Sequence, residues 1–502
     1  MVQYEKLGHA ALAMLLWCAC LACSTSSHSP ETTQAELIVS GATLIDGTGA
    51  PPQAETSIIV RDGRVDAVIP DSDAEGLAAE TVIDATGKFL IPGLADMHVH
   101  FGLGAPVSRK PETTDVVLAR ELYYGVTAIL MLGGTDGSTD SIRALRDRRA
   151  RGELKSPHIY GTGGHLTLHG THPIYTIFPP GVREATDSLA ADTPMSEPVN
   201  LYSLGIGISL VRTEEAARTA VQERAKGGMH AIKITVESGP TPFGDDHPQM
   251  SVEMIRAIVD EAAQHDLRVF AHVTSRDELE AAFEGGAAGA VHTVEGHPLS
   301  DTALADRMAA AGFIVVPTLS LYSGLVSLWY VDEPFDTSDA FLRETVSNEE
   351  VAALKNPAFL TRFRRGGSVT IEPGVDSHEA NTRRIAGLLA NVKMLHDQGV
   401  PLALGTDTGN PYVFPGYSVH RELELLVRAG LTPMEALETA TRNAAEMIGA
   451  GAEFGTIEPG KRADLLILNA NPLDDIRNTR SLETVISEGR MVNRRALLGS
   501  AD

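Results

Sequence analysis

Short runs of apolar and β-branched residues alternate with amphipathic stretches through the middle of the chain. The apolar runs predict eight strands, at residues 94–98, 127–132, 158–161, 230–235, 268–271, 289–291, 313–317 and 402–405. Amphipathic periodicity predicts helices between them, including residues 213–226, 251–265, 276–284 and 433–448. Strands that alternate with helices favour a parallel sheet, and eight such units fit an α/β fold of the (β/α)8 TIM-barrel type with insertions.

The two ends of the chain carry a second pattern, in which apolar and polar residues alternate between turn signals. In residues 35–90, Asp62-Gly63 separates two such runs and predicts a two-residue hairpin. A similar pattern returns in residues 455–494. We therefore expect residues 35–90 and 455–494 to form one small composite β domain, a β-sandwich, with the barrel of residues 91–454 inserted between them.

Two connections inside the predicted barrel, residues 162–212 and 318–385, are too long for passive loops. The second carries Trp329, Tyr330 and many charged residues. Long segments of this kind in a compact domain are usually lids or pocket walls. We therefore expect these two insertions to shape the substrate-binding site.

Residues 1–23 resemble an export signal, with Lys6 near the start, an apolar run, and then Leu21-Ala22-Cys23. The apolar run is too short for a membrane span, which needs about 20 apolar residues. Leu-Ala-Cys before a Ser/Thr-rich segment is similar to the lipobox of bacterial lipoproteins, which implies a lipid anchor at Cys23 and a polar tether at residues 24–34. We expect an exported periplasmic or cell-surface lipoprotein, with a secreted soluble protein as the alternative.

The composition narrows the classes of partner and of site. The 502 residues include 66 acidic and 41 basic side chains, which give a net charge of −25. Such a chain repels phosphate backbones, so we expect no nucleic-acid partner. All three cysteines lie within the first 23 residues, which excludes a disulfide scaffold, a thiolate metal site and a cysteine nucleophile in the body of the protein.

Polar side chains stand at or near the carboxyl ends of five predicted strands. They are His98 and His100 at the first strand, Lys233 in the fourth, His272 after the fifth, His292 after the sixth and Asp407 after the eighth. A single histidine at a strand end is usually structural, but the carboxyl ends of barrel strands share one rim, where these residues would converge. Imidazole and carboxylate groups suit zinc or a similar divalent ion, so their joint occurrence predicts a metal centre.

Several segments resemble, in order, the motifs of the amidohydrolase superfamily. They are Pro92-Gly-Leu-Ala-Asp-Met-His98-Val-His100, Ala403-Leu-Gly-Thr-Asp407, Gly430-Leu-Thr-Pro-Met-Glu-Ala-Leu437, Ala440-Thr-Arg-Asn-Ala444 and Gly455-Thr-Ile-Glu-Pro-Gly-Lys-Arg-Ala-Asp464-Leu. The resemblance covers residues 35–494. It is strongest for the imidazolonepropionase-like branch, which includes bacterial Xaa-Pro dipeptidases of the amidohydrolase type.

The resemblance implies a role for each of the six polar residues. It implies that one metal ion is bound by His98, His100 and Asp407, that a second is bound by His272 and His292, and that both are bridged by Lys233 carboxylated with carbon dioxide. Two divalent ions, with zinc as the expected metal, would activate a bridging water and polarise the scissile carbonyl. Asp407 would carry the proton from that water to the leaving nitrogen.

Five further residues are weaker candidates. His165, in Gly-Thr-Gly-Gly-His after the third strand, is the candidate for polarising the substrate carbonyl. His169 and His172 follow in the same loop, and at most one of them is expected to contact substrate. A loop histidine without a role is the alternative for all three. His297 is expected to be structural, and Arg212 is a candidate for binding a substrate carboxylate.

We expect a binuclear metal-dependent amidohydrolase that cleaves the amide C–N bond of a small molecule or peptide, namely a dipeptide, an N-acyl amino acid or a cyclic amide. A mononuclear deaminase is an alternative, although similar deaminases have a glutamate where this chain has Ser275. A second alternative is phosphotriesterase or lactonase activity at the same metal centre. A non-catalytic binding lipoprotein would be expected to have lost ligands. A homo-oligomer is compatible with these patterns.

Overall fold

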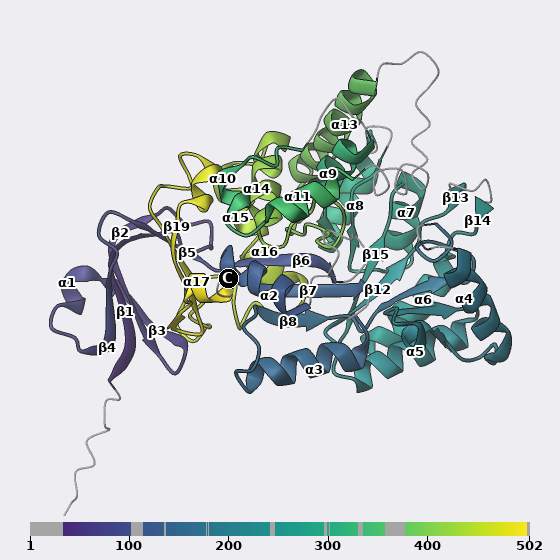
Figure 1. Cartoon of the computed structure of the whole chain (residues 1–502), viewed down its shortest axis with the longest axis horizontal. Coiled ribbons are helices and arrows are strands. Elements are labelled where there is room, and N and C mark those ends of the chain that lie inside the picture. The colour runs from purple at the N-terminus through teal and green to yellow at the C-terminus, as the bar shows by residue number, and fades with distance from the viewer. Residues whose placement is uncertain are drawn as a thin grey trace, which may run out of the picture.

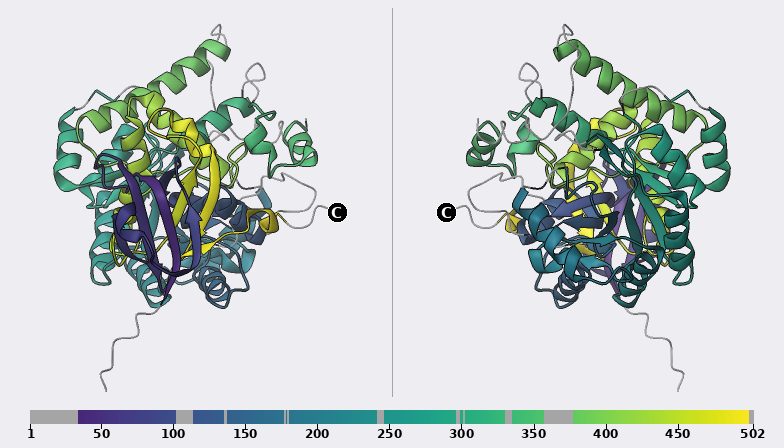
Figure 2. Two further views of the ribbon diagram at one scale, coloured as in Figure 1. Left: turned by 90° about the vertical axis from the view of Figure 1, so that its left-hand side faces the viewer. Right: turned by 90° about the vertical axis from the view of Figure 1, so that its right-hand side faces the viewer.

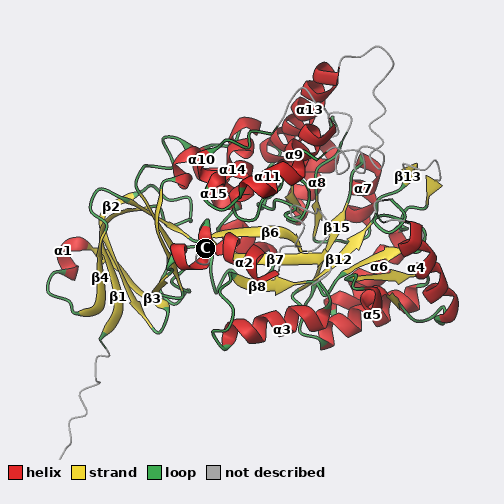
Figure 3. Cartoon of the chain, viewed as in Figure 1, coloured by secondary structure: helices red, strands yellow, loops and turns green. Residues whose placement is uncertain are grey.

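The computed structural model describes residues 34–101, 114–134, 137–176, 178, 180–240, 246–295, 299–300, 302–329, 335–356 and 377–498. The predicted export signal and nearly all of the predicted tether lie outside these residues. A sheet occupies one end of the molecule, and a mixed α/β body lies beside it (Figures 1 and 3). Within the described ranges, no helix combines the length and the apolar character needed to cross a membrane.

Strands from both ends of the chain share one hydrogen-bonded sheet. Its strands are β1 (Ala35–Leu44), β2 (Gln53–Arg61), β3 (Arg64–Pro70), β4 (Ala79–Asp84), β5 (Phe89–Pro92), β18 (Leu465–Leu468), β19 (Leu482–Ser487) and β20 (Arg490–Met491). β18 runs antiparallel to β5, with Leu466 opposite Ile91, so purple and yellow strands lie side by side in Figure 2. The predicted hairpin joins β2 and β3, and Asp62 and Gly63 both have the positive φ that a type I′ turn requires.

Seven of the eight predicted barrel strands are present as parallel neighbours. One set contains β6 (Leu94–Phe101), β7 (Val126–Gly134) and β8 (His158–Gly161), and the other includes β12 (Ala231–Thr235), β15 (Arg268–His272), β16 (Gly289–Val291) and β17 (Ile314–Val316). The amide of His230, just before β12, donates to the carbonyl of Gly161 at the end of β8 over 2.9 Å. This hydrogen bond joins the two sets of strands.

The eighth predicted strand, residues 402–405, is an extended segment with isolated pairings. On one side the amide of Ala403 donates to the carbonyl of Val315 in β17 over 3.0 Å. On the other side the amide of His100 in β6 donates to the carbonyl of Thr408 over 2.7 Å. Residues 401–408 therefore lie between β17 and β6.

Residues 162–212, predicted above as an insertion, contribute strands to the sheet. They contain β9 (His165–Leu168), β10 (Val199–Asn200) and β11 (Ile208–Val211), which extend it in the order β10-β11-β9-β12. Gly163 and Gly164 have φ values of +69° and +83°, which glycine adopts readily, and they separate β9 from β8. His165 is therefore a strand residue in register with Lys233 rather than a loop residue.

Helices surround the parallel strands, and three of the predicted ones begin within one residue of the predicted start. The helices α5 (Glu214–Lys226), α6 (Val252–Ala263) and α7 (Arg276–Glu284) are capped by the side chains of Thr213, Ser251 and Ser275. The other helices of the described residues are α1 (Asp71–Ala74), α2 (Thr114–Tyr123), α3 (Thr139–Ala150), α4 (Pro180–Asp192), η1 (Leu201–Leu204), α8 (Thr302–Ala311), α9 (Leu319–Trp329), α10 (Ala340–Arg343), α11 (Asn348–Leu354), α13 (Ser377–Asp397), α14 (Tyr417–Ala429), η2 (Ile476–Arg480) and α17 (Arg494–Leu497). The short strands β13 (Gly239–Pro240) and β14 (Asp246–His247) form a separate pair.

The predicted helix at residues 433–448 is two helices, α15 (Pro433–Thr439) and α16 (Arg442–Met447). The start of α15 is as predicted, with a capping box and proline in the first turn. The break follows because the carbonyls of Thr439 and Ala440 accept hydrogen bonds from the amides of Leu404 (2.9 Å) and Ala95 (2.7 Å). The chain uses these carbonyls to attach the helices to the strands.

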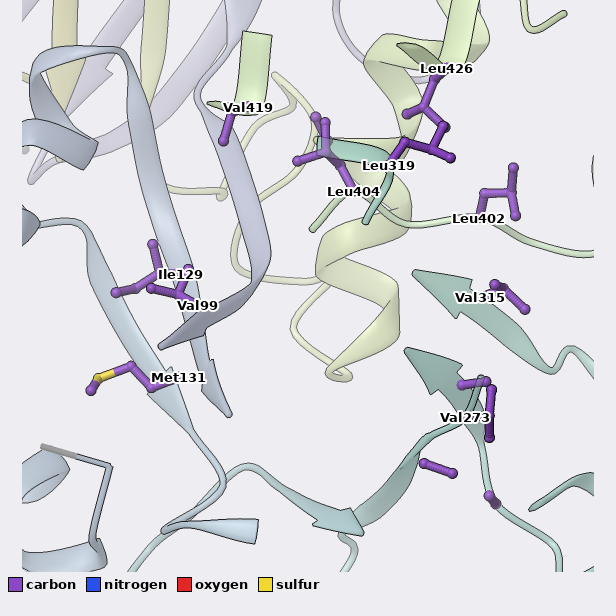
Figure 4. Close-up of a cluster of buried hydrophobic side chains, with 14 of the residues drawn as sticks. Val99, Ile129, Met131, Val273, Val315, Leu319, Leu402, Leu404, Val419 and Leu426 are labelled. Atoms are coloured by element: carbon purple, nitrogen blue, oxygen red, sulfur yellow. The ribbon is translucent and has the colours of Figure 1, made fainter. Parts of the chain in front are cut away.

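The parallel strands are buried on both faces, and each face packs in a different apolar cluster. Along β7, Leu130 and Leu132 belong to a small cluster, whereas Ile129 and Met131 belong to a large cluster. Figure 4 shows part of the large cluster, where strand residues meet residues of the helices such as Val419. Burial on both faces explains why these strands are continuous apolar runs in the sequence.

The small cluster defines the side of the sheet toward which the candidate ligands point. Ala231 of β12 and Phe270 of β15 both belong to it. Side chains alternate along a strand, so Lys233 and His272 project to the same side as Ala231 and Phe270. The two strands are direct parallel neighbours. The fold thus places both residues on one face.

Candidate metal centre

Three buried side chains converge where β6 ends beside residues 401–408. Nε2 of His98 lies 3.0 Å from Nε2 of His100, and these nitrogens lie 3.5 Å and 3.3 Å from Oδ1 of Asp407. No described residue forms a hydrogen bond with that oxygen. Two imidazole nitrogens and a carboxylate oxygen at these separations fit a single divalent ion, whose ligands lie about 2.0–2.2 Å away.

Asp96 and Gly405 hold β6 against the segment that carries Asp407. Asp96 accepts hydrogen bonds from the amides of His98 (3.1 Å) and Thr406 (3.0 Å) and from the Thr406 hydroxyl (2.5 Å). A Cβ atom at Gly405 would lie only 2.7 Å from the Cβ of His98, so this close approach requires glycine. The position of Asp407 beside the two histidines is therefore fixed by the backbone.

His292 and His272 continue from this group as a row of imidazole rings. The ring centroids of His98 and His292 are 4.9 Å apart, and those of His292 and His272 are 4.5 Å apart. Nδ1 of His292 lies 2.7 Å from the Thr318 hydroxyl, and its Nε2 lies 3.9 Å from Oδ2 of Asp407. The hydrogen bond to Thr318 leaves Nε2 of His292 available as a ligand.

Lys233 is almost fully buried, with 2% of its surface exposed. Its Nζ atom has no hydrogen-bond partner among the described residues. Burial lowers the pKa of this amine, and the carboxylate of Asp407 opposes the shift. A buried lysine without a partner is costly, so its surroundings suit a chemical group other than a bare ammonium.

A second group of ligand types lies beside His272. Oε2 of Glu237 lies 2.8 Å from Nε2 of His272 and 3.3 Å from Nδ1 of His172. One ligand atom from each of the three residues lies within 4.8 Å of the others. The side chains of this group are 13–21% exposed, against 1–9% for His98, His100 and Asp407. The second group is therefore the more accessible of the two.

The sequence prediction missed Glu237. The only signal for it is its place four residues beyond Lys233 and just past the end of β12. Burial raises the pKa of Glu237, but His172 and His272 outweigh this effect and lower the pKa to about 2. The side chain is therefore a carboxylate at neutral pH.

Five imidazoles of the site are neutral at pH 7. Burial is the main cause, and it holds the pKa of His98, His165 and His292 well below the usual 6.5, with nearby Lys233 and other histidines adding to the effect. Burial also lowers the pKa of His100 to about 3 and that of His172 to about 4. A neutral imidazole has a lone pair to offer a metal ion.

His165 lies within the same group, as expected for a residue of the site. A Cβ atom at Gly133 would lie 3.3 Å from Nδ1 of His165 and 3.8 Å from Nδ1 of His100, so the two rings flank this glycine. Nε2 of His165 is buried and has no hydrogen-bond partner among the residues that the structure describes. This nitrogen could serve as a hydrogen-bond donor to a bound molecule.

The other weak candidates have different surroundings. Nε2 of His169 lies 3.0 Å from the carboxylate of Asp187 at the surface. The guanidinium of Arg212 donates to the backbone carbonyls of Ala190, Thr193 and Pro194 over 2.6–2.9 Å, which assigns it a structural role instead of carboxylate binding. His297 lies outside the described residues. Of the three histidines predicted to lie in one loop, the structure brings His165 and His172 to the site.

Comparison with known proteins supports the class of the site. The model of the Amidohydrolase family matches residues 89–492. The chain is 27% identical to the ochratoxinase of Aspergillus niger over 467 residues, which cover 89% of this chain and 84% of that protein. It is 25% identical to the imidazolonepropionase of Geobacillus kaustophilus over 456 residues, which cover 87% of this chain and 89% of that protein. The solved structure of a Xaa-Pro dipeptidase with bound methionine has a TM-score of 0.66 at 23% identity, covering 91% of this chain and 99% of that one.

An α/β body that gathers buried histidines and a carboxylate at the ends of its parallel strands is an arrangement that fits a metal-dependent hydrolase. The family match extends over far more than half of the chain. The chain therefore belongs to the Amidohydrolase family, and it is a hydrolase, as the sequence predicted. The dipeptidase structure shows the same fold.

Proposed function

We propose that this chain is a binuclear metal-dependent amidohydrolase that cleaves the amide C–N bond of a dipeptide, an N-acyl amino acid or a cyclic amide. The observation that carries the proposal is the presence of two adjacent ligand groups, one buried around Asp407 and one partly exposed around His272. The ring of His292 stands between them. A single ion would need only one of these groups.

The proposed ligands are His98, His100 and Asp407 for the first ion, His272 and His292 for the second, and carboxylated Lys233 as the bridge. The support for the bridge is the buried Nζ of Lys233, which has no partner among the described residues. Carboxylation would replace an unpaired cation with an anion that offers two oxygen atoms to two cations. Zinc is the expected metal, because imidazole and carboxylate ligands suit it.

The bound ions would supply a lowered pKa for water and polarisation of the scissile carbonyl. Asp407 is proposed to accept the proton of the attacking water at Oδ2, because Oδ1 is the oxygen that faces His98 and His100 and would bind the first ion, and to return the proton to the leaving nitrogen. The same proton is taken up and released, so the carboxylate is regenerated in each cycle. His165 is proposed to donate a hydrogen bond from Nε2 to the substrate carbonyl oxygen.

The deaminase alternative has less support. The position at which the similar deaminases have a glutamate is occupied by Ser275, which is the N-cap of α7. Its side chain accepts a hydrogen bond from the amide of Glu278, and the Glu278 side chain completes a capping box. This residue therefore starts a helix and has no acid–base function.

The scaffold is proposed to be a (β/α)8 barrel at residues 91–454 with a β-sandwich from residues 35–90 and 455–494. Support comes from the continuous pairing of the parallel strands. It runs from β6 to β8, passes through β12 to β17, and returns to β6 through residues 401–408. This arrangement would bring the carboxyl ends of all the strands to one rim.

The protein is also proposed to be exported and anchored at Cys23 as a lipoprotein, on the basis of Leu21-Ala22-Cys23. Labelling of the protein in cells with a radioactive fatty acid tests the anchor. Label that is present in the natural chain and absent in Cys23→Ser supports it. Equal labelling of both would contradict it.

The test of the proposed function combines metal analysis with a substrate library. The purified protein is expected to contain about two metal equivalents by mass spectrometry, and Lys233→Ala to lose most of them, while the exposed Lys155→Ala keeps them. A full metal content in Lys233→Ala would overturn the bridging role. A library of dipeptides and N-acyl amino acids, with phosphotriesters and lactones alongside, tests the substrate class. Turnover confined to phosphotriesters or lactones would refute the amidohydrolase proposal.

A further inference from the structure

We infer that Glu237 and His172 are direct ligands of the metal ion held by His272. The second metal position would then have a carboxylate and an additional imidazole that the assignment above does not include. The inference rests on the proposed function, because it concerns the second of the two proposed ions.

The backbone places Glu237 beside His272. β12 and β15 are parallel, with Thr235 opposite His272. Beyond the end of β12 the chain continues along β15, because the amide of Val236 donates to the carbonyl of His272 over 3.1 Å. The next side chain, that of Glu237, reaches Nε2 of His272 at 2.8 Å. This is a hydrogen-bond distance, a little shorter than the roughly 3.0–3.4 Å that separates two atoms bound to one ion about 2.1 Å away, so the two atoms lie close enough to share an ion.

His172 approaches the same point from the segment after β9. Its ring is stacked on that of His272, with centroids 4.8 Å apart and planes inclined by 18°. Nδ1 of His172 lies 3.3 Å from Oε2 of Glu237 and 2.7 Å from the Thr176 hydroxyl, a hydrogen bond that a bound ion would replace at this nitrogen. Three ligand types from three separate segments thus meet at one place.

The charge of Glu237 also requires a partner. Its ion-pair contacts with described residues are to His172 and His272, and no described lysine or arginine pairs with it. Its side chain is only 20% exposed. A carboxylate in such surroundings is normally paired with a cation or coordinates a metal. A divalent ion at this point would supply the positive charge and use the lone pairs of the two imidazoles.

A carboxylate ligand has consequences for the choice of metal. Oxygen ligands favour harder ions such as Mn²⁺, while imidazoles suit zinc and cobalt as well. Five protein side chains at the second position would also raise its coordination number above the four of the usual zinc site. The second ion is therefore expected to be the one more easily replaced by manganese.

Cobalt substitution of the full-length protein tests the inference without relying on activity. The metal-free protein is reloaded with Co²⁺, and bound cobalt and the visible absorption spectrum are recorded for the natural chain and for Glu237→Gln. We expect Glu237→Gln to bind one of its cobalt ions about 10- to 100-fold more weakly and to show altered visible bands, because an anionic oxygen ligand is lost. Glu261→Gln is the matched control, since Glu261 is a buried glutamate of α6 that contacts Gln222, and it should match the natural chain.

The outcomes separate this inference from the proposed function. Unchanged cobalt affinity and spectrum in Glu237→Gln would overturn the inference and leave the two-metal proposal intact. One cobalt ion per natural chain would overturn the two-metal proposal, and the spectrum of Glu237→Gln would still decide whether Glu237 is a ligand. If Glu237→Gln does not fold, His172→Ala is compared with His169→Ala in the same assay. Equal cobalt binding and spectra in these two variants would refute a ligand role for His172.

Discussion

The hydroxyl of Thr318 is predicted to set the metal affinity of His292. Both residues are buried, and Oγ1 of Thr318 lies 2.7 Å from Nδ1 of His292. When Nε2 binds a metal ion, Nδ1 carries the proton and must donate it to this hydroxyl. Thr318→Val keeps the shape but leaves the buried N–H unsatisfied, which costs about 1–3 kcal/mol. Because 1.4 kcal/mol is tenfold in an equilibrium constant, we expect the affinity at this position to fall about 5- to 150-fold.

A competitive titration with a chelating dye measures this affinity, and urea unfolding of the metal-free protein measures any separate loss of stability. Thr293→Val is the matched control. Thr293 is buried next to His292 in the sequence, but its hydroxyl has no hydrogen-bond partner among the described residues. Its removal should leave the metal affinity unchanged. An unchanged affinity in Thr318→Val, or an equal loss in both variants, would refute the reasoning.

Three further predictions follow from the described contacts. His165→Asn should lower kcat about 100-fold while the metal content stays unchanged, because the hydrogen bond to the substrate carbonyl is lost. Steady-state kinetics should show no such loss of kcat in the surface variant His169→Asn. Lys233→Met should raise the melting temperature of the metal-free protein, because it removes a buried amine that has no partner among the described residues. The variant should also lose the stabilisation that added metal gives the natural chain. A lower melting temperature of metal-free Lys233→Met would contradict this prediction. Burial lowers the pKa of His420 to about 3, so the unfolded chain binds a proton that the folded protein excludes. The stabilising contribution of neutral His420 is complete above about pH 6.5 and falls as the pH falls, by about 2 kcal/mol at pH 5. In urea unfolding at pH 7 and pH 5, the free energy of unfolding should therefore decrease less in His420→Gln than in the natural chain.

Much of the parallel sheet was predictable because its strands are buried on both faces. Such a strand is a continuous apolar run whatever its partners are, and the predicted bounds of β8 and β16 agree with the structure. The convergence of His98 and Asp407 was predictable for a related reason. A polar residue at the carboxyl end of a parallel strand reaches the common edge, and the local sequence marks where the strand ends.

The remaining features depend on pairing between distant segments. β9 is a four-residue strand set off by two glycines, and so short a run does not distinguish a strand from a loop. The break after α15 depends on Ala95, which lies far away in the sequence. Glu237 gains its significance only because Thr235 lies opposite His272. None of these relations leaves a periodic pattern in the local sequence.

The pairing of β18 with β5 also orders the folding of the chain in time. β5 is synthesised before the strands of the α/β body, but its partner Leu465–Leu468 appears only after all of them. Until then one edge of β5 is open to pairing with other chains, and contacts between such distant segments form slowly. A chain that ended before β18 would retain every proposed metal ligand and still expose this edge. Loss of the C-terminal strands is therefore expected to cause aggregation before it affects the chemistry of the site.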